Sequence, residues 1–274
     1  MKKLLSALLV LALALSLGLS APAEEKTVIK LGLVGENSEQ WEPAIRELAK
    51  EGITLELVKF ADYTLPNRAL QDGEIDLNAF QHYAFLEKDS QAFGYQLAAV
   101  GDTIIAPLGL YSRKIADVNE IKENDKIAVP NDPTNEGRAL KLLEAAGLIK
   151  VDPEVGFLPE KSDITENPLN LDIIEVEAAQ TAGLLPDVAA AIINGQHAVD
   201  NNLFPQTDAI FLETAGGNTN NPFVNIVAAR AEEKDNPLYQ KVVAQFRTQE
   251  VAEILLTQYK GAYLPTWDYE PPNQ

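Results

Sequence analysis

The sequence predicts an α/β protein of two lobes, each built around a doubly wound sheet, joined by two crossovers. Strand-like and helix-like segments alternate from residue 28 onward, which favours parallel strands with helices packed on their faces. The pattern pauses at residues 104–111 and restarts at residues 126–130, so a second α/β unit follows the first. A late apolar segment, residues 223–230, can then return the chain to the first lobe.

The first lobe begins with a predicted β–α–β unit. Residues 28–34 (VIKLGLV) and 53–60 (ITLELVKF) are apolar and strand-like. Between them, Asn37 is expected to cap a helix that ends at Gly52, with Gln40 as its capping-box partner. The apolar residues expected on the buried face of this helix are Trp41, Ile45, Leu48 and Ala49. A helix between two strands implies that the strands run parallel.

The remaining elements complete both lobes. Residues 104–111 (IIAPLGLY) contain a proline and a glycine, so we expect an edge or crossover strand there. The second lobe is expected to contain strands at residues 126–130, 172–176 and 188–193, with helices at residues 136–146 and around residues 178–184. Residues 236–259 carry helical spacing, and the tail, residues 268–274, is expected to be disordered. We therefore predict one lobe over residues 27–108 and 224–267, and the other over residues 109–223.

The N-terminus has the pattern of a secretory signal peptide. A basic start with Lys2 and Lys3 precedes the apolar run of residues 4–19, and Ala21-Pro22-Ala23 offers small residues for cleavage. The alternative is a single membrane anchor, although the run is shorter than the roughly 20 residues that span a bilayer. We predict a signal over residues 1–23 and export to the periplasm or the outer face of the cytoplasmic membrane.

Charge and cysteine content exclude several classes of function. The formal net charge is −19, and removal of Lys2 and Lys3 with the signal makes it −21. Such a surface repels nucleic acid and anionic lipid, so we expect no nucleic-acid partner. The sequence contains no cysteine, which excludes disulfides, thiol catalysis, thiolate metal sites and the lipidated N-terminal cysteine of bacterial lipoproteins.

Three predicted strands end in loops rich in hydrogen-bonding side chains. Residues 80–82 (FQH), 131–138 (NDPTNEGR) and 194–197 (NGQH) each follow an apolar run. Ligands of open α/β sheets bind at the carboxyl ends of the strands, so we expect these loops to converge. Amides, a histidine and an arginine in one pocket suit a small zwitterion.

Seven sequence blocks carry a family resemblance. In chain order they are residues 62–70 (DYTLPNRAL), 73–86 (GEIDLNAFQHYAFL), 106–112 (APLGLYS), 129–149 (VPNDPTNEGRALKLLEAAGLI), 177–181 (EAAQT), 193–198 (INGQHA) and 221–226 (NPFVNI). In these blocks the chain resembles the methionine-binding lipoprotein family, the solute-binding partners of methionine-type ABC importers. The resemblance extends over about residues 27–267. It implies the two-lobed periplasmic binding protein fold of type II, whose lobes close on a free amino acid, most often methionine.

The resemblance also implies which residues bind the ligand. Four would enclose its side chain: Tyr63, Phe80, His82 and Phe85. Three would hold its charged groups: Arg138 would pair with the carboxylate, while Asn194 and Asn225 would hold the α-amino group and the carboxylate edge. No cofactor or metal is implied, the partner is an ABC permease with its ATPase, and the binding protein is expected to be a monomer.

Without the resemblance, the polar residues allow simpler interpretations. The planar fork of Arg138 matches a carboxylate, and a position in the first turn of its helix would add the helix dipole. The alternative is a surface arginine paired with Glu136 or Glu144. Asn194 and Asn225 can accept from an ammonium group and donate to a carboxylate, but they also suit a turn and a half-exposed strand.

The aromatic residues and histidines leave similar alternatives. Tyr63 and Phe80 can line an apolar slot, in which a thioether packs well, or they can be ordinary core residues. His82 is a candidate donor at the pocket wall. His197 is expected on the helix surface or behind the pocket wall.

Two departures from the family pattern leave the exact ligand open. Ala84-Phe85 stand where the family often has proline and tyrosine, so a phenol hydroxyl is missing. Gln196-His197 replace commoner small or tyrosine residues, and residues 35–41 form a variant loop. Another amino acid or a short peptide is therefore the alternative ligand, with Gln196 as the residue able to admit it.

Metal and enzyme functions find little support. Two histidines far apart in sequence, without cysteine or an HExxH motif, do not predict a tetrahedral zinc site. The chain lacks GxSxG and a glycine-rich phosphate loop. A carboxylate pair such as Asp62 and Asp76 would suit a hydrolase, but 41 acidic residues produce such pairs by chance. We predict a non-enzymatic, extracytoplasmic solute-binding protein that captures methionine and delivers it to an ABC importer.

Overall fold

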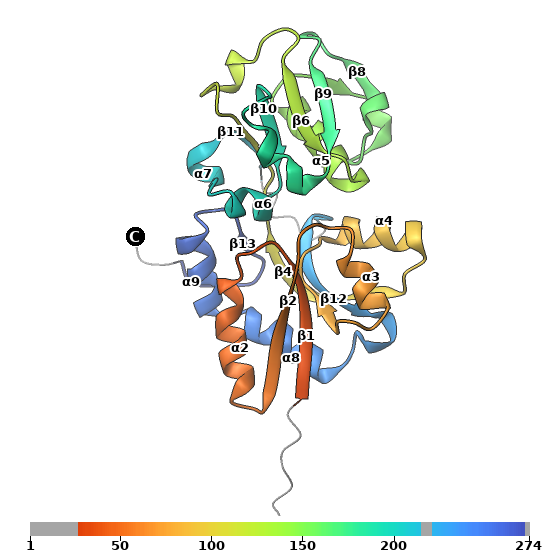
Figure 1. The fold of residues 1–274 in the computed structure, drawn as a ribbon, viewed down its shortest axis with the longest axis vertical. Helices are drawn as coiled ribbons and strands as arrows, with labels where there is room; N and C mark the ends of the chain where they lie inside the picture. The colour runs from red at the N-terminus through yellow and green to blue at the C-terminus, as the bar shows by residue number, and fades with distance from the viewer. Residues whose placement is uncertain (1–26, 215–220, 272–274) are drawn as a thin grey trace, which may run out of the picture.

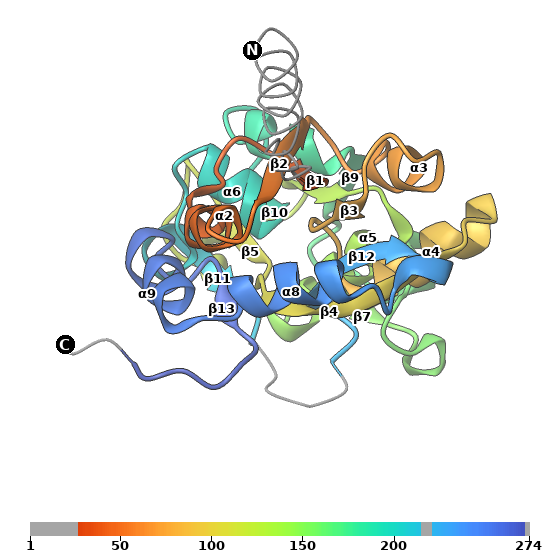
Figure 2. The same cartoon turned by 90° about the horizontal axis from the view of Figure 1, so that it is seen from below.

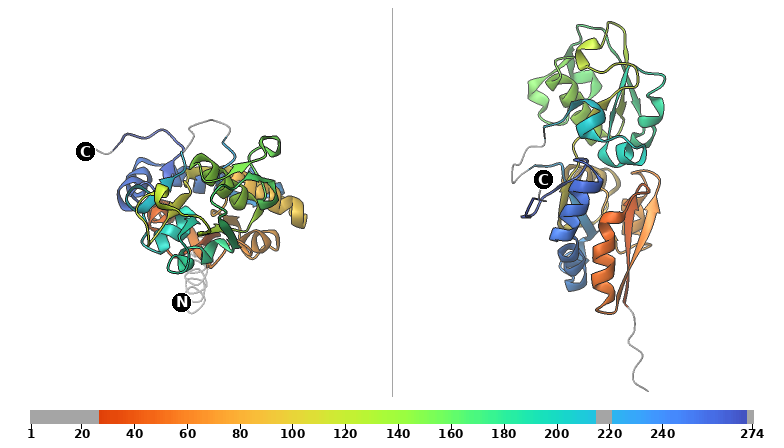
Figure 3. Two further views of the ribbon diagram at one scale, coloured as in Figure 1. Left: turned by 90° about the horizontal axis from the view of Figure 1, so that it is seen from above. Right: turned by 90° about the vertical axis from the view of Figure 1, so that its left-hand side faces the viewer.

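The computed structural model describes residues 27–214 and 221–271, which form two α/β lobes stacked along the long axis of the molecule (Figure 1). A side view shows the same division, with the N-terminal strands and the C-terminal helices together in one lobe (Figure 3). The predicted signal peptide, residues 1–23, lies outside the described residues. Among the described residues, no helix is long and apolar enough to cross a membrane.

The first lobe contains a six-stranded sheet with the strand order β13-β4-β12-β3-β1-β2. Its strands are β1 (Thr27–Val34), β2 (Ile53–Phe60), β3 (Leu77–Asn78), β4 (Leu97–Ile105), β12 (Val224–Arg230) and β13 (Leu264–Pro265). β1 runs parallel to β2 along its whole length and parallel to β3, which confirms the predicted β–α–β unit. β12 returns antiparallel between β3 and β4, so the sheet is mixed.

Helices cover both faces of this sheet. They are α2 (Glu42–Ala49), α3 (Pro66–Gln71), α4 (Tyr83–Phe93), α8 (Pro237–Phe246) and α9 (Gln249–Gln258). Figures 1 and 2 place α2 and α9 toward one side of the lobe and α3 and α4 toward the opposite side. The helices α2 and α8 contact each other and bury one face of the sheet.

The second lobe contains a five-stranded sheet with the order β11-β5-β10-β6-β9. Its strands are β5 (Gly109–Tyr111), β6 (Lys126–Pro130), β9 (Asp172–Val176), β10 (Ala190–Ile193) and β11 (Ala209–Leu212), and its helices are α5 (Pro133–Ala145), α6 (Gly195–Asp200) and α7 (Pro205–Asp208). A small hairpin of β7 (Lys150–Val151) and β8 (Ile164–Glu166) lies beside them. β6 is parallel to β9 and β10, and β5 pairs antiparallel with both of its neighbours, β10 and β11.

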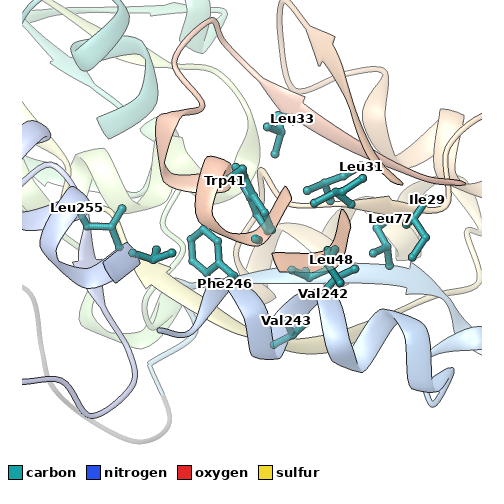
Figure 4. Packing of buried hydrophobic residues seen from close by; sticks show 14 of the residues in the cluster. Ile29, Leu31, Leu33, Trp41, Leu48, Leu77, Val242, Val243, Phe246 and Leu255 are labelled. Carbon is teal, nitrogen blue, oxygen red and sulfur yellow. The ribbon is translucent and has the colours of Figure 1, made fainter. Parts of the chain in front are cut away.

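The core of the first lobe forms where the apolar faces of its helices pack against the sheet. Trp41 and Leu48 are buried as predicted and pack with α8, and the rings of Trp41 and Phe246 lie 4.3 Å apart (Figure 4). Ala49, by contrast, is exposed, and Ala44 takes the buried position. The helix begins only at Glu42, after a single 3-10 turn, and its buried residues are Pro43, Ala44 and Leu48.

Several predicted elements are divided in the structure. Residues 104–111 are not one strand: β4 ends at Ile105, the chain passes between sheets through residues 106–108, and β5 begins in the other sheet. Pro107, which cannot donate to a ladder, lies in this passage. Residues 236–259 form two helices, because Thr248 caps the second one by accepting from the amide of Val251. Residues 178–184 form two short 3-10 turns rather than an α-helix.

The start of the first helix and the C-terminal segment also differ from the sequence prediction. Asn37 does not cap the helix, since its side chain donates instead to Asp200 of α6, and Ser38 precedes the 3-10 turn without a side-chain cap. Near the C-terminus, Glu270 exchanges two hydrogen bonds with the side chain of Gln249. Residues 272–274 of the predicted disordered tail lie outside the described residues.

We expect Leu48→Ala to lower the free energy of unfolding by about 2–5 kcal/mol, since Leu48 is fully buried and its loss leaves a cavity. Urea denaturation followed by circular dichroism measures this change. The matched control is Leu65→Ala, where the side chain is 53% exposed and the expected change stays within about 0.5 kcal/mol. Equal losses in the two variants would contradict the packing described for α2.

Candidate functional site

A cavity of about 80 Å³ lies between the two lobes. The structure brings all seven predicted site residues to its wall, namely Tyr63, Phe80, His82, Phe85, Arg138, Asn194 and Asn225. Their positions follow from the topology, because the carboxyl ends of β1 and β3 in one lobe and of β6 and β10 in the other all lead into this wall. The part played by each residue in ligand binding stays a prediction.

A buried amide cluster orients the Phe80-Gln81-His82 segment. The side chain of Gln81 is buried and exchanges hydrogen bonds of 2.6 and 2.8 Å with the amide of Asn67. It also donates to Asn78 at 2.9 Å. In extended chain, neighbouring side chains point to opposite sides, so anchoring Gln81 inward turns Phe80 and His82 toward the cavity.

His82 is held in one tautomer by its position at the start of α4. Its Nδ1 accepts from the backbone N–H of Phe85 at 3.1 Å, so the ring proton lies on Nε2. Nε2 then donates to Oδ1 of Asn135 at 3.4 Å. Burial, together with the charge of Arg138, lowers the pKa of His82 to about 3. The imidazole is therefore neutral at physiological pH and donates its one N–H to Asn135, while its role as a donor to a ligand stays a prediction.

The orientation of Asn135 is fixed by Asp132, the N-cap of α5. A carboxylate only accepts, so Nδ2 of Asn135 faces Asp132, at 2.9 and 3.0 Å, and Oδ1 faces the cavity side. This Oδ1 receives Nε2–H of His82 and Nδ2–H of Asn194, the latter at 2.9 Å. Asn194 thus presents Oδ1 as its other end, and this buried oxygen has no hydrogen-bond partner among the described residues. Asn194, a residue of the cavity wall, therefore carries an acceptor without a donor.

Arg138 is 4% exposed and is paired with Glu213, not with Glu136 or Glu144. Its Nε and Nη2 donate to the two carboxylate oxygens at 2.7 and 2.5 Å, and Nη2 also donates to the carbonyl of Ala106. Among the described residues, no acceptor is bonded to Nη1. One amino group of a charged, oriented guanidinium is therefore left for a ligand.

Two expectations about Arg138 need correction. It lies in the second turn of α5, because the helix begins at Pro133. The start of this helix is already capped, since Asp132 accepts from the amide of Asn135. Arg138 therefore does not occupy the first-turn position that the sequence predicts. The guanidinium instead lies over the ring of Phe223, 4.5 Å from the centroid.

The aromatic residues form a connected wall. The ring of Tyr63 lies 5.8 Å from Phe80 and 6.0 Å from Phe85, and Phe80 meets Phe85 edge-on at 5.6 Å. Burial raises the pKa of the Tyr63 hydroxyl, so it stays protonated. His197 is buried and its ring lies 5.0 Å from Tyr63, so it lies behind this wall and not on the helix surface.

Gln196 reaches the cavity, but both ends of its amide are engaged. Its Oε1 accepts from the hydroxyl of Tyr263 at 2.6 Å, and its Nε2 donates to Asp200 at 3.0 Å. This replacement in the family pattern therefore connects protein groups to one another. It adds less polar capacity to the cavity than the sequence suggests.

Sequence reasoning missed Asn135, Glu213 and Phe223 as parts of the site. Asn135 belongs to the same sequence block as Arg138, and its spacing from the Asp132 cap was the available signal. Phe223 lies in the block that contains Asn225. Glu213 lies 75 residues from Arg138 and carries no local motif, so only the fold reveals the pair.

No metal centre is visible in the part of the chain that the structure describes. Within residues 27–214 and 221–271, no group of three or more His, Cys, Asp or Glu side chains is arranged to hold an ion. The site instead combines neutral amides, a neutral histidine, aromatic rings and one paired arginine. These groups suit reversible binding of a small molecule with a donor, an acceptor and an apolar part.

Two α/β lobes with such a cavity between them define the class of two-lobed solute-binding proteins. The chain belongs to the NlpA lipoprotein family, whose family model matches residues 29–267. A probable D-methionine-binding lipoprotein MetQ of Vibrio cholerae is 41% identical over 273 residues, which cover 97% of this chain and 100% of that protein.

Solved structures show the same similarity. A nutrient-binding protein of Burkholderia cenocepacia, bound to methionine, has a TM-score of 0.82 and 39% identity, covering 87% of this chain and 100% of its own. The substrate-binding protein of a methionine transporter of Streptococcus pneumoniae has a TM-score of 0.82 and 38% identity. The match covers 88% of this chain and 96% of that protein's chain. The predicted family resemblance and the two-lobed α/β fold are confirmed.

We expect His82→Asn to flatten the acid dependence of stability in the ligand-free protein. The unfolded histidine takes up a proton near pH 6.5, whereas the folded one resists it down to about pH 3. The wild-type protein therefore loses stability as the pH falls below 6.5, by up to about 1.4 kcal/mol per pH unit from this residue. Asparagine does not titrate and still accepts at an N-cap position.

Urea denaturation at pH 6.5 and 4.5 measures the difference. The variant should lose about 2 kcal/mol less than the wild type over this interval. Because burial also lowers the pKa of His197, that residue contributes acid sensitivity to both proteins and cancels in the comparison. Identical losses would show that His82 is not held neutral in the folded state.

Proposed function

We propose that this protein is an extracytoplasmic binding protein that captures methionine between its lobes and delivers it to an ABC importer. The observation that carries the proposal is the unpaired, buried Oδ1 of Asn194 in the same cavity as Arg138. An acceptor and a cationic donor beside an aromatic wall match the ammonium, carboxylate and side chain of an apolar amino acid. Relatives described as methionine-binding proteins support the same ligand.

The charged groups of the ligand have complementary partners. Its ammonium group would donate to Oδ1 of Asn194, which removes an unsatisfied buried acceptor. Its carboxylate would accept from Nη1 of Arg138, with Asn225 at the carboxylate edge. A zwitterion adds no net charge to a cavity in which Arg138 is already neutralised by Glu213. The ligand that fits best is therefore neutral overall.

The side chain of the ligand would lie against Tyr63, Phe80 and Phe85. Thioether sulfur packs favourably on aromatic rings, at about 5 Å. The missing hydroxyl at Phe85 makes this wall more apolar than a tyrosine would. Because Gln196 is bonded at both ends, we favour methionine over a polar amino acid or a short peptide.

The partners follow from the class of protein. We propose that an ABC permease with its ATPase receives the ligand, that the binding protein acts as a monomer and that it has no catalytic activity. The relatives' descriptions as lipoproteins and as the substrate-binding protein of a transporter support a location outside the cytoplasmic membrane. The proposed limits of the lobes are residues 27–108 with 224–267, and residues 109–223.

The direct test is mass spectrometry of small molecules released by denaturing freshly purified protein, followed by calorimetric titration of refolded, ligand-free protein. The proposal expects released methionine and its rebinding in unchanged form. Release of another amino acid or a dipeptide would refute methionine as the ligand, but the protein would still be a solute-binding protein. Turnover of the bound molecule would overturn the assignment as a binding protein.

We expect Arg138→Gln to weaken methionine binding at least about a hundredfold. Without Arg138 the buried carboxylate of the ligand loses its charged partner, which costs on the order of 3–5 kcal/mol. Glutamine still offers Glu213 a donor, which limits the effect on folding. The matched control is Lys141→Gln on the same helix, where the lysine pairs with Glu144 near the surface. Calorimetry that finds equal affinities for both variants would exclude Arg138 from the carboxylate site.

Selectivity provides a separate expectation. Methionine should bind about thirtyfold more tightly than alanine, because burial of the longer side chain contributes roughly 0.8 kcal/mol per methylene-sized group, or about 2 kcal/mol in total. Glutamate should bind more weakly still, since its second carboxylate would be buried without a partner. A competition panel of the standard amino acids measures this order. A polar amino acid that outcompetes methionine would refute the ligand but not the fold.

A further inference from the structure

A carboxylate of the second lobe receives hydrogen bonds from a loop of the first. Asp200, at the end of α6, accepts from the side-chain amide of Asn37 at 2.6 Å and from its backbone N–H at 3.4 Å. The backbone N–H of Glu36 also points to this carboxylate, at 3.3 and 3.4 Å from its two oxygens. These donors belong to the loop that follows β1, so the contact joins the two lobes.

The loop is shaped for this approach. Gly35 has φ of +86°, and a Cβ there would lie 2.3 Å from Oδ2 of Asp200, closer than any side chain allows. Only glycine therefore lets the loop come this close to α6. From its other side, Lys59 holds the loop by donating to the carbonyl of Glu36 at 2.8 Å.

The same carboxylate also orders a residue of its own lobe. It accepts from Nε2 of Gln196 at 3.0 Å, and Gln196 in turn accepts from the hydroxyl of Tyr263 in the first lobe. Asn37, Gln196 and Tyr263 all line the cavity, whereas Asp200 does not. Asp200 is thus linked to cavity side chains from both lobes without reaching the cavity itself.

We propose that Asp200 is a positioning residue that holds the lobes closed over the bound ligand, an inference that rests on the proposed binding function. The groups that donate to Asp200 belong to the loop after β1 in the first lobe, whereas Asp200 belongs to α6 in the second lobe. Separation of the lobes therefore breaks the contact. An interaction made only in the closed arrangement shifts the equilibrium toward it and slows ligand release. Hydrogen bonds from N–H groups to a charged carboxylate are stronger than those between neutral groups.

The binding test compares Asp200→Ala with Asp187→Ala, an exposed aspartate of the same lobe. Asp200→Ala should weaken methionine binding about tenfold or more, mainly through faster dissociation in stopped-flow measurements, with an unchanged melting temperature of the ligand-free protein. Asp200→Asn, which keeps one acceptor oxygen, should lie between the wild type and the alanine variant. Asp187→Ala should match the wild type.

A second measurement does not depend on the ligand's identity. The chain has no cysteine, so Lys88→Cys and Glu123→Cys allow two spin labels to be placed on exposed sites of the two lobes. Pulsed electron paramagnetic resonance should show a larger share of long interlobe distances when Asp200→Ala is added. An unchanged distance distribution together with unchanged dissociation would overturn the inference, as would a melting temperature lowered in proportion to the affinity.

The two measurements keep the proposals separate. If the wild-type protein binds no methionine, the proposed ligand fails, while the distance distributions still report on Asp200. If methionine binds and Asp200→Ala changes neither dissociation nor distance, the role of Asp200 fails and the function stands.

Discussion

The site depends on the orientation of one amide, that of Asn135, which the carboxylate of Asp132 sets. A carboxylate accepts only, so Asn135 must turn Oδ1 toward His82 and Asn194, and each of them must then donate. The other end of Asn194 is left as an acceptor, and the other ring nitrogen of His82 is left to cap α4. A helix cap in the second lobe thereby fixes the tautomer of His82 in the first lobe and leaves Oδ1 of Asn194 as the acceptor without a partner. A reversed amide would place an N–H where the ligand's ammonium group is expected.

The pairing of Arg138 with Glu213 sets the charge of the cavity. An unpaired guanidinium at 4% exposure would be costly, and the bidentate carboxylate offsets that cost and fixes the plane of the fork. The consequence for recognition is that the site carries little net charge before a ligand arrives. A zwitterion preserves this balance, whereas an anion would add a charge beside Glu213 and a cation would add one beside Arg138. The charge balance of the cavity is thus consistent with the proposed ligand, an amino acid without net charge.

The sequence could predict those features that local patterns encode. Apolar alternation and a central helix predicted the parallel pair β1 and β2, and the sequence blocks predicted seven residues that the fold brings to one cavity. It could not predict partners set by tertiary approach. Glu213 meets Arg138 across 75 residues and Asp200 meets Asn37 across 163, and short polar side chains at such separations leave no periodic signal. Asn37 illustrates this directly, because its side-chain and backbone N–H groups donate to Asp200 in the other lobe, and Ser38 precedes the 3-10 turn in its place.

Two of the departures from the family pattern share one contact residue in the structure. The variant loop at residues 35–41 and the replacement at Gln196 are far apart in sequence, yet Asp200 bonds to both. The sequence predicts that Gln196 can admit other ligands, but its amide is engaged by Tyr263 and Asp200. The unusual residues at positions 35–41 and 196 therefore lie where the two lobes contact each other. Under the proposed role of Asp200, variation of this kind would alter the closing equilibrium, whereas the proposed ligand contacts lie with Asn194, Arg138 and the aromatic wall.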